Sequence, residues 1–128
     1  MVIDSSAIIA LLNKEPEAKD IAAKIADAKH RMMAAPNVFE VYIVAEKRWG
    51  MEGAAFVTRF LHETRTDIRP FGRELIHQAQ LAWRQFGKGR HPAALNFGDC
   101  MAYALANSLK MPLLFKGDDF ARTDITSA

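Results

Sequence analysis

Several carboxylates in this sequence lie beside apolar residues, where an acidic side chain is unfavourable unless it has a partner. Burying an unpaired carboxylate destabilises a protein even after the surroundings relax, so stability alone would favour apolar residues at these positions. A function that needs acids is therefore expected. The acids are Asp4 after Val2-Ile3, Glu40 within Val38–Ile43, Asp99 beside Cys100, and Asp118 and Asp119 after Leu113–Phe115.

Carboxylates gathered in one place repel one another and raise each other's pKa unless a divalent cation neutralises them. An oxygen-only ligand set favours Mg²⁺ or Mn²⁺, and the lack of paired Cys and His residues argues against structural zinc. Such a metal can polarise a phosphodiester and activate a water molecule for in-line attack. The acids therefore indicate phosphodiester hydrolysis.

Each acid also has an ordinary structural explanation. Asp4 and Asp99 can cap the helices that follow them. Glu40 can form a buried ion pair with an arginine such as Arg48. Asp118 and Asp119 adjoin a glycine, and aspartate is common in such turns. Only the occurrence of all of them in one chain favours a shared site.

Short apolar runs that alternate with amphipathic segments supply the elements that must position these acids. Residues 1–3 predict a strand and residues 5–12 a helix, and a second helix follows Pro16 with its apolar face at Ala18, Ile21, Ala22 and Ile25. Residues 32–35 form a brief apolar run that Pro36 ends. Asn37 can cap the next helix, although Val41–Val44 would also suit a strand.

The second half of the chain continues the alternation. Gly50 is predicted to end the helix that carries Glu40, and two further amphipathic helices are expected around residues 57–61 and 75–86, with a short strand at 68–71 between them. A helix over 100–110 and a buried strand over 113–115 follow. The tryptophans and phenylalanines are expected to lie largely on core stripes.

This order of elements predicts an α/β fold with a mainly parallel central sheet. Ligands of such sheets bind at the carboxyl ends of the strands. Asp4 and the Asp118-Asp119 pair both follow strands directly. They are therefore expected to converge at one edge of the sheet.

Composition excludes several classes of protein. The 128 residues are 50% hydrophobic and 25% charged, which is typical of a folded globular domain, and no repeat or linker divides them. One domain over residues 1–128 is expected. The single Cys100 cannot form an intramolecular disulfide, and no apolar run is long enough to cross a bilayer. We expect a cytoplasmic protein without a membrane partner, and the net charge of +2 permits contact with a polyanion without demanding it.

Four segments together resemble the PIN-domain ribonucleases, and in particular the VapC toxins of type II (VapBC) toxin–antitoxin systems. The resemblance covers nearly the whole chain, and its most specific segment is the third. The segments are Val2-Ile3-Asp4-Ser5-Ser6-Ala7, Phe39-Glu40-Val41-Tyr42-Ile43-Val44, His91-Pro92-Ala93-Ala94-Leu95-Asn96-Phe97-Gly98-Asp99-Cys100, and Leu113-Leu114-Phe115-Lys116-Gly117-Asp118-Asp119-Phe120 followed by Thr123-Asp124-Ile125.

The resemblance implies a PIN-like three-layer α/β/α sandwich whose acidic pocket binds Mg²⁺ or Mn²⁺ and cleaves structured RNA, often tRNA or rRNA. It implies a VapB-like antitoxin as partner and a homodimer. By motif, Asp4 and Asp99 would be the principal metal ligands, and Glu40 would complete the cluster and help to orient or activate water. Ser6 would either hydrogen-bond the acids from behind or cap its helix.

The fourth acid departs from the family pattern. Many PIN domains have a hydroxyl residue, a spacer and an aspartate after the last buried strand, where this chain has Phe115-Lys116-Gly117. Asp118 or Asp119 must then serve, with a slight preference for Asp119. Loss of this ligand would instead fit a catalytically inert PIN-like module that binds RNA or an antitoxin.

A phosphoaspartate phosphatase or receiver-type domain also places an aspartate after its first strand. Such phosphatases need a second aspartate two residues later, where this chain has Ser6. Receivers need a phosphoacceptor at a strand end in mid-chain, and no good candidate is present. The sequence therefore favours the nuclease.

Overall fold

A four-stranded parallel sheet forms the centre of the protein. The computed structural model describes residues 1–128. The strands are ordered β3-β2-β1-β4 across the sheet, and every neighbouring pair is parallel. Their bounds are β1 (Val2–Ile3), β2 (Met32–Ala34), β3 (Asp67–Arg69) and β4 (Leu113–Leu114).

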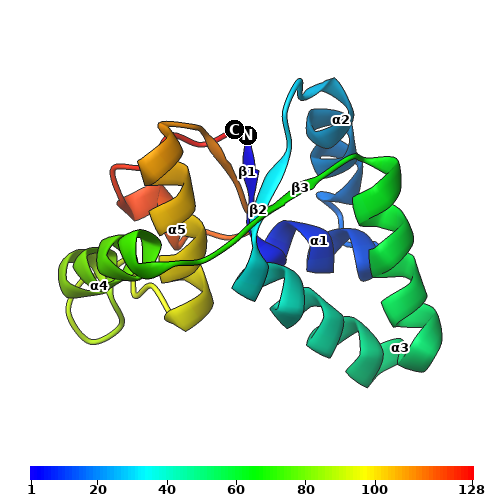
Figure 1. The fold of residues 1–128 in the computed structure, drawn as a ribbon, viewed down its shortest axis with the longest axis horizontal. Helices are drawn as coiled ribbons and strands as arrows, with labels where there is room; N and C mark the ends of the chain where they lie inside the picture. Colours follow the sequence, from blue (N-terminus) through cyan, green and yellow to red (C-terminus); the bar gives the residue numbers. More distant parts are fainter.

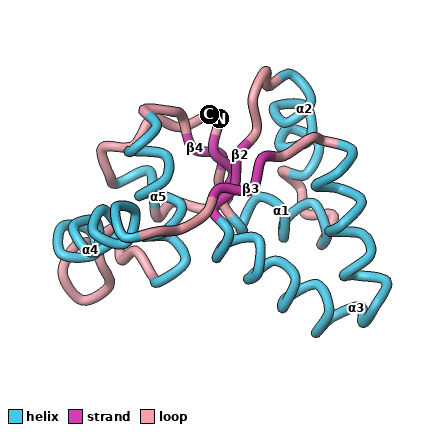
Figure 2. Tube along the Cα trace, in the orientation of Figure 1, coloured by secondary structure: helices cyan, strands magenta, loops and turns pink.

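Helices cover both faces of this sheet (Figure 1). One layer contains α1 (Ser5–Leu12), α2 (Ala18–Asp27) and α3 (Ala35–Glu63), and the other contains α4 (Arg73–Phe86) and α5 (Phe97–Leu109). Figure 2 shows the strands between the two helical layers. A short 3-10 helix, η1 (Phe120–Arg122), follows β4. The predicted three-layer α/β/α architecture is confirmed.

The strands feed two separate hydrophobic cores because successive side chains of a strand point to opposite faces. Val2 and Leu113 pack with α4 and α5, whereas Ile3 and Leu114 pack with α1, α2 and α3. All four side chains are fully or almost fully buried. Strands β1 and β4 can be short because their residues are buried on both faces, and β2 is mostly buried, whereas the edge strand β3 is largely exposed.

Helix α3 differs most from the prediction. It begins at Ala35 and not at Asn37, because Ala34 is the last extended residue and a proline is tolerated in the first helical turn. The segment 41–44 is helical. Gly50 interrupts the helix with φ 60° and ψ −147°, so the predicted break is confirmed, but the chain resumes as a second helical segment of the same element.

Other helix and strand boundaries differ from the predicted ones by a few residues. Helix α5 begins at Phe97, three positions before the predicted start, because Asn96 caps it. Strand β3 occupies residues 67–69 where 68–71 was predicted. None of the helices is long and apolar enough to span a membrane.

The prediction that the large aromatic residues lie largely on core stripes was wrong for several of them. Phe39 is 67% exposed and Phe97 is 79% exposed, and both tryptophans are partly exposed. These side chains belong to α3, α4 and α5, and neighbouring elements cover only part of each helix's apolar surface.

Candidate active site

Asp4 lies at the end of β1 and caps α1, as its sequence position predicted. One carboxylate oxygen, Oδ2, accepts a hydrogen bond of 2.9 Å from the backbone N–H of Ser6. The other oxygen, Oδ1, is buried and has no hydrogen-bond partner, and the residue as a whole is 1% exposed. A cap needs only one oxygen, so capping alone leaves Oδ1 unexplained.

Glu40 lies on the second turn of α3 and receives a hydrogen bond of 2.7 Å at Oε2 from the Ser5 hydroxyl. The alternative ion pair with Arg48 is absent. The Arg48 guanidinium donates instead to the side-chain oxygen of Asn13. The Glu40 carboxylate is therefore held by a neutral donor and forms no salt bridge.

Asp99 is the third residue of α5 and forms a capping box with Asn96. The Asn96 N–H donates to Asp99 Oδ2 at 2.8 Å, and the Asp99 N–H donates to Asn96 Oδ1 at 2.9 Å. The N-cap of α5 is thus Asn96 and not Asp99, which is instead the reciprocal partner of the cap. The first bond orients the Asp99 carboxylate, the second fixes its backbone, and the residue is 9% exposed.

The acids act on one another electrostatically. Burial, together with the charges of Asp4, Asp119 and Glu40 and against the hydrogen bond from Asn96, raises the pKa of Asp99 from its ordinary value of 3.8 to about 6. Burial also raises the pKa of Asp4, with hydrogen bonds from Ser6 opposing and the charge of Glu40 adding to the shift. The four acids therefore share one electrostatic environment.

Of the two candidates for the fourth acid, Asp119 is the one whose charge reaches Asp99; Asp118 is not among the groups that shift its pKa. The turn before them is tight, because Gly117 has φ 98°. Lys116 donates its backbone N–H to the Ser6 hydroxyl at 3.0 Å, which ties the exit of β4 to the start of α1. The fold thus brings Asp119 to the same edge of the sheet as Asp4.

Comparison with known proteins agrees with this arrangement. The PIN domain family model matches residues 1–125. The protein named Ribonuclease VapC from Mycolicibacterium smegmatis is 41% identical over 127 residues, which are 99% of this chain and 98% of that protein. The chain belongs to the VapC family of PIN-domain ribonucleases.

Solved structures of VapC-family proteins share the fold. The structure of VapC20 from Mycobacterium tuberculosis, described as a sarcin–ricin loop cleaving toxin, has a TM-score of 0.81 at 15% identity and covers 99% of this chain and 97% of its own. A toxin–antitoxin complex from Klebsiella pneumoniae has a TM-score of 0.73 at 19% identity and covers 99% of this chain and 95% of that chain.

Two residues of this VapC-family protein, Ser5 and Asn37, lie beside the site, although the sequence patterns did not predict this position for them. Ser5 holds Glu40. Asn37, which was expected to cap α3, is instead fully buried, and its side-chain amide donates to the backbone oxygen of Gly98 at 3.0 Å. An asparagine next to the apolar run of α3 is the one signal that could have marked Asn37 beforehand, because a buried amide needs a hydrogen-bond partner.

A cavity of about 490 Å³ lies between α3 and α5 and reaches Glu40. Glu40 and Gly98 line it together with exposed apolar side chains, among them Phe39, Ile43 and Phe97. An apolar surface thus begins directly beside one of the carboxylates.

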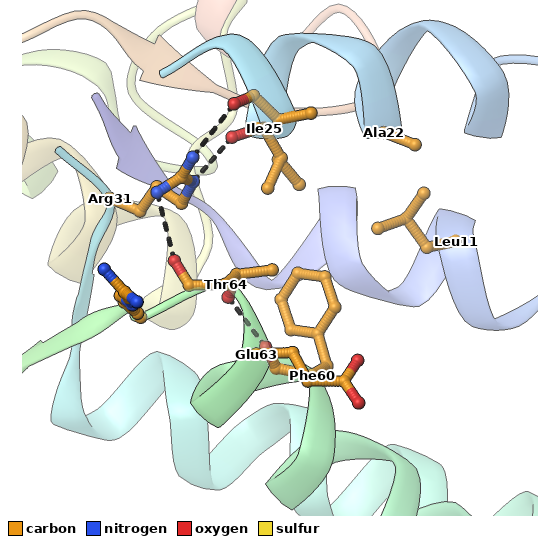
Figure 3. Close-up of a pocket in the computed structure, with 9 residues that line it drawn as sticks. Leu11, Ala22, Ile25, Arg31, Phe60, Glu63 and Thr64 are labelled. Carbon is orange, nitrogen blue, oxygen red and sulfur yellow. Dashed lines mark hydrogen bonds between the residues drawn. The ribbon is translucent and has the colours of Figure 1, made fainter. Parts of the chain in front are cut away.

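The largest cavity lies elsewhere. It measures about 540 Å³ and is lined by residues of α1, α2 and the end of α3, including Arg31 (Figure 3). The Arg31 guanidinium donates to the backbone oxygens of Ile25, Ala26 and Thr64, which joins the ends of α2 and α3. Arg31 and Thr64 precede β2 and β3, so this cavity is at the opposite end of the parallel strands from the acids.

Two further observations define what the site can do. Burial and the neighbouring charge of Asp99 raise the pKa of the Cys100 thiol to about 11, so it is not a nucleophile at neutral pH. No three Asp, Glu, His or Cys side chains are grouped closely enough to form a complete metal site as they stand. The carboxylates share an environment, but they would have to move together to enclose an ion.

Proposed function

We propose that this chain is a metal-dependent endoribonuclease, the toxin of a VapBC-type toxin–antitoxin pair, which hydrolyses phosphodiester bonds of structured RNA such as tRNA or rRNA. The observation that carries the proposal is the buried, unpartnered Oδ1 of Asp4 beside three other carboxylates. A protein retains such an arrangement when a cation completes it, because a buried polar atom without a partner is strongly unfavourable.

The donor set suits a hard divalent cation. Asp4 and Asp99 each use one carboxylate oxygen for a helix cap and have a second oxygen outside that hydrogen bond. They would hold Mg²⁺ or Mn²⁺, with Glu40 and Asp119 completing the negative charge. Such an ion would supply a polarised scissile phosphate and a water molecule of lowered pKa.

The protein's own groups would then perform the remaining tasks. The caps at Ser6 and Asn96 orient the two principal carboxylates. Ser5 orients Glu40, whose free Oε1 can accept a proton from an attacking water molecule. A cation bound to Asp4 and Asp99 would lower their raised pKa values, because a nearby positive charge favours the ionised carboxylate, so both would be ionised in the working site.

One observation favours a second candidate, an inert PIN-like module that binds RNA or an antitoxin without cleavage. Gly117 stands where many family members have the fourth acid, and a side chain there would meet open space. The electrostatic contact between Asp119 and Asp99 supports the catalytic alternative. A phosphoaspartate reaction at Asp4 has no such support, because its free oxygen is buried.

The decisive experiment compares purified wild-type protein with the Asp99→Asn variant on total bacterial RNA, in Mg²⁺, in Mn²⁺ and in chelator, followed by sequencing of the new RNA ends. Asp118→Asn is the matched control, since Asp119, and not Asp118, is among the charges that raise the pKa of Asp99. Discrete cuts are expected from wild type and Asp118→Asn with metal only. Absence of cuts by folded wild type would establish the inert module.

We also propose a VapB-like antitoxin and a second copy of this chain as partners. Exposed apolar side chains around Phe39, Ile43 and Phe97 favour a protein partner beside the acids, and the Klebsiella pneumoniae neighbour is a toxin–antitoxin complex. Light scattering should give a dimer for wild type and a monomer for Phe97→Asp. A monomeric wild type would refute the homodimer.

A further inference from the structure

Gly98 occupies the second position of α5, between Phe97 and Asp99, where the backbone does not require glycine. It is not among the residues with positive φ, and it lies within the regular helix. Alanine is the better helix former at an ordinary helical position. The presence of glycine here therefore needs a reason other than backbone conformation.

The reason lies in the space around its Cα atom. A Cβ atom at position 98 would lie 2.7 Å from Oε2 of Glu40, and 3.3 Å from both Cδ and Oε1. The first of these distances is well inside van der Waals contact. The Glu40 carboxylate thus lies against the Cα of Gly98, and the same Oε2 accepts the hydrogen bond of 2.7 Å from Ser5.

The backbone at Gly98 is itself held in place. Its carbonyl oxygen accepts the hydrogen bond of 3.0 Å from the buried side chain of Asn37, which belongs to the first turn of α3. The next residue, Asp99, is fixed by the capping box. A side chain at position 98 would therefore displace the flexible end of Glu40 and leave the two helices where they are.

We infer that Gly98 is a positioning residue for Glu40: its missing side chain, together with the Ser5 hydroxyl, sets where the Glu40 carboxylate stands relative to Asp4 and Asp99. This inference rests on the proposed nuclease function, because the consequence of moving Glu40 is a loss of cleavage. Misplacing a reacting group by about 1 Å can lower a rate about 100-fold.

The test compares Gly98→Ala with Gly72→Ala in metal-dependent RNA cleavage. Gly72 is the matched control, since its φ of −90° suits alanine and an added Cβ would have nothing within 4 Å. Gly98→Ala is expected to lower kcat about 100-fold with KM little changed, and to keep the wild-type melting temperature. Gly72→Ala is expected to cleave like wild type.

A double-mutant cycle separates positioning from a general structural effect. Aspartate at position 40 is shorter by one methylene, so its carboxylate withdraws from the Cβ atom that Gly98→Ala introduces. Adding Gly98→Ala to Glu40→Asp should therefore cause little further loss, whereas a purely structural defect would lower activity equally in both backgrounds. An equal loss in both backgrounds, or full activity of Gly98→Ala, would overturn the inference.

Crystal structures of wild type and Gly98→Ala without RNA distinguish the two possible failures. The variant should show the Glu40 carboxylate displaced and its hydrogen bond to Ser5 lost, whether or not the protein cleaves RNA. If the Glu40 carboxylate is displaced in the variant but the wild type never cleaves RNA, the nuclease proposal is refuted, while the contact between Gly98 and Glu40 stands. An unmoved Glu40 would refute the role of Gly98.

Discussion

Replacement of Asp99 by asparagine is expected to make the metal-free protein more stable at neutral pH, although it removes the proposed activity. Burial and the charges of Asp4, Asp119 and Glu40 raise the pKa of Asp99 to about 6. Asparagine keeps the shape and an oxygen that can accept the hydrogen bond from Asn96, but it has no charge. The substitution therefore removes repulsion while it preserves the helix cap.

The magnitude follows from the shift in pKa. A rise from 3.8 to about 6 corresponds to about 3 kcal/mol at 1.36 kcal/mol per pH unit. Screening by solvent reduces this to about 2 kcal/mol, and loss of the favourable interaction between a negative charge and the helix N-terminus removes up to about 1 kcal/mol more. The expected net stabilisation is about 1 kcal/mol, or roughly 4 °C in melting temperature.

The pKa shift also determines how the stability contributed by Asp99 changes with pH. Because the folded-state pKa of Asp99 lies above its unfolded value of 3.8, the folded state binds the proton more tightly. The contribution of this group to stability is therefore fully present below pH 3.8, is lost as the pH rises through about 6, and stays lost at pH 7. The advantage of asparagine should appear over the same interval.

Thermal unfolding of both proteins in chelator, followed by circular dichroism at pH 4 and pH 7, measures this difference. Asp118→Asn serves as the control for removing a charge nearby. The expected result is a higher melting temperature for Asp99→Asn at pH 7 and a much smaller difference at pH 4. A lower melting temperature at pH 7, or an equal gain at both pH values, would refute the reasoning.

Three further predictions follow from the site and its supports. Asn96→Ala should lower stability by about 1 kcal/mol because the Asp99 N–H loses its hydrogen bond to the Asn96 side chain, and should lower activity because this cap fixes the first turn of α5, which carries Asp99; unfolding in urea and RNA cleavage measure both, and an unchanged midpoint would contradict the cap. Gly50→Ala should destabilise the protein by about 1–3 kcal/mol, because φ 60° and ψ −147° suit glycine alone; the same unfolding assay reports it, and no change would mean that the kink relaxes. Addition of Mg²⁺ at pH 7 should raise the melting temperature of wild type and not of Asp4→Asn, and an equal rise in both would place the ion elsewhere.

Much of the fold could be predicted from local patterns. The apolar run before Asp4 and the run at Leu113 marked the central strands, and the order of strands and helices indicated the parallel three-layer architecture. The helix boundaries were less accurate. Helix α5 begins earlier than predicted because Asn96 caps it, and α3 begins earlier because its first turn tolerates Pro36. The periodicity of apolar residues reports neither the hydrogen bonds of a cap nor the missing N–H of a proline.

The sequence by itself determined which acids are candidates for the site, Asp4, Glu40 and Asp99, because each stands beside apolar residues where a carboxylate is unfavourable. Only the tertiary structure decided that the charge of Asp119 is among those that raise the pKa of Asp99, and that Ser5 rather than Arg48 bonds to Glu40. The contact of Gly98 with Glu40 joins residues far apart in the chain. Such contacts depend on how α3 and α5 pack around the sheet, and packing at that scale is set by the whole core and not by any local pattern of residues.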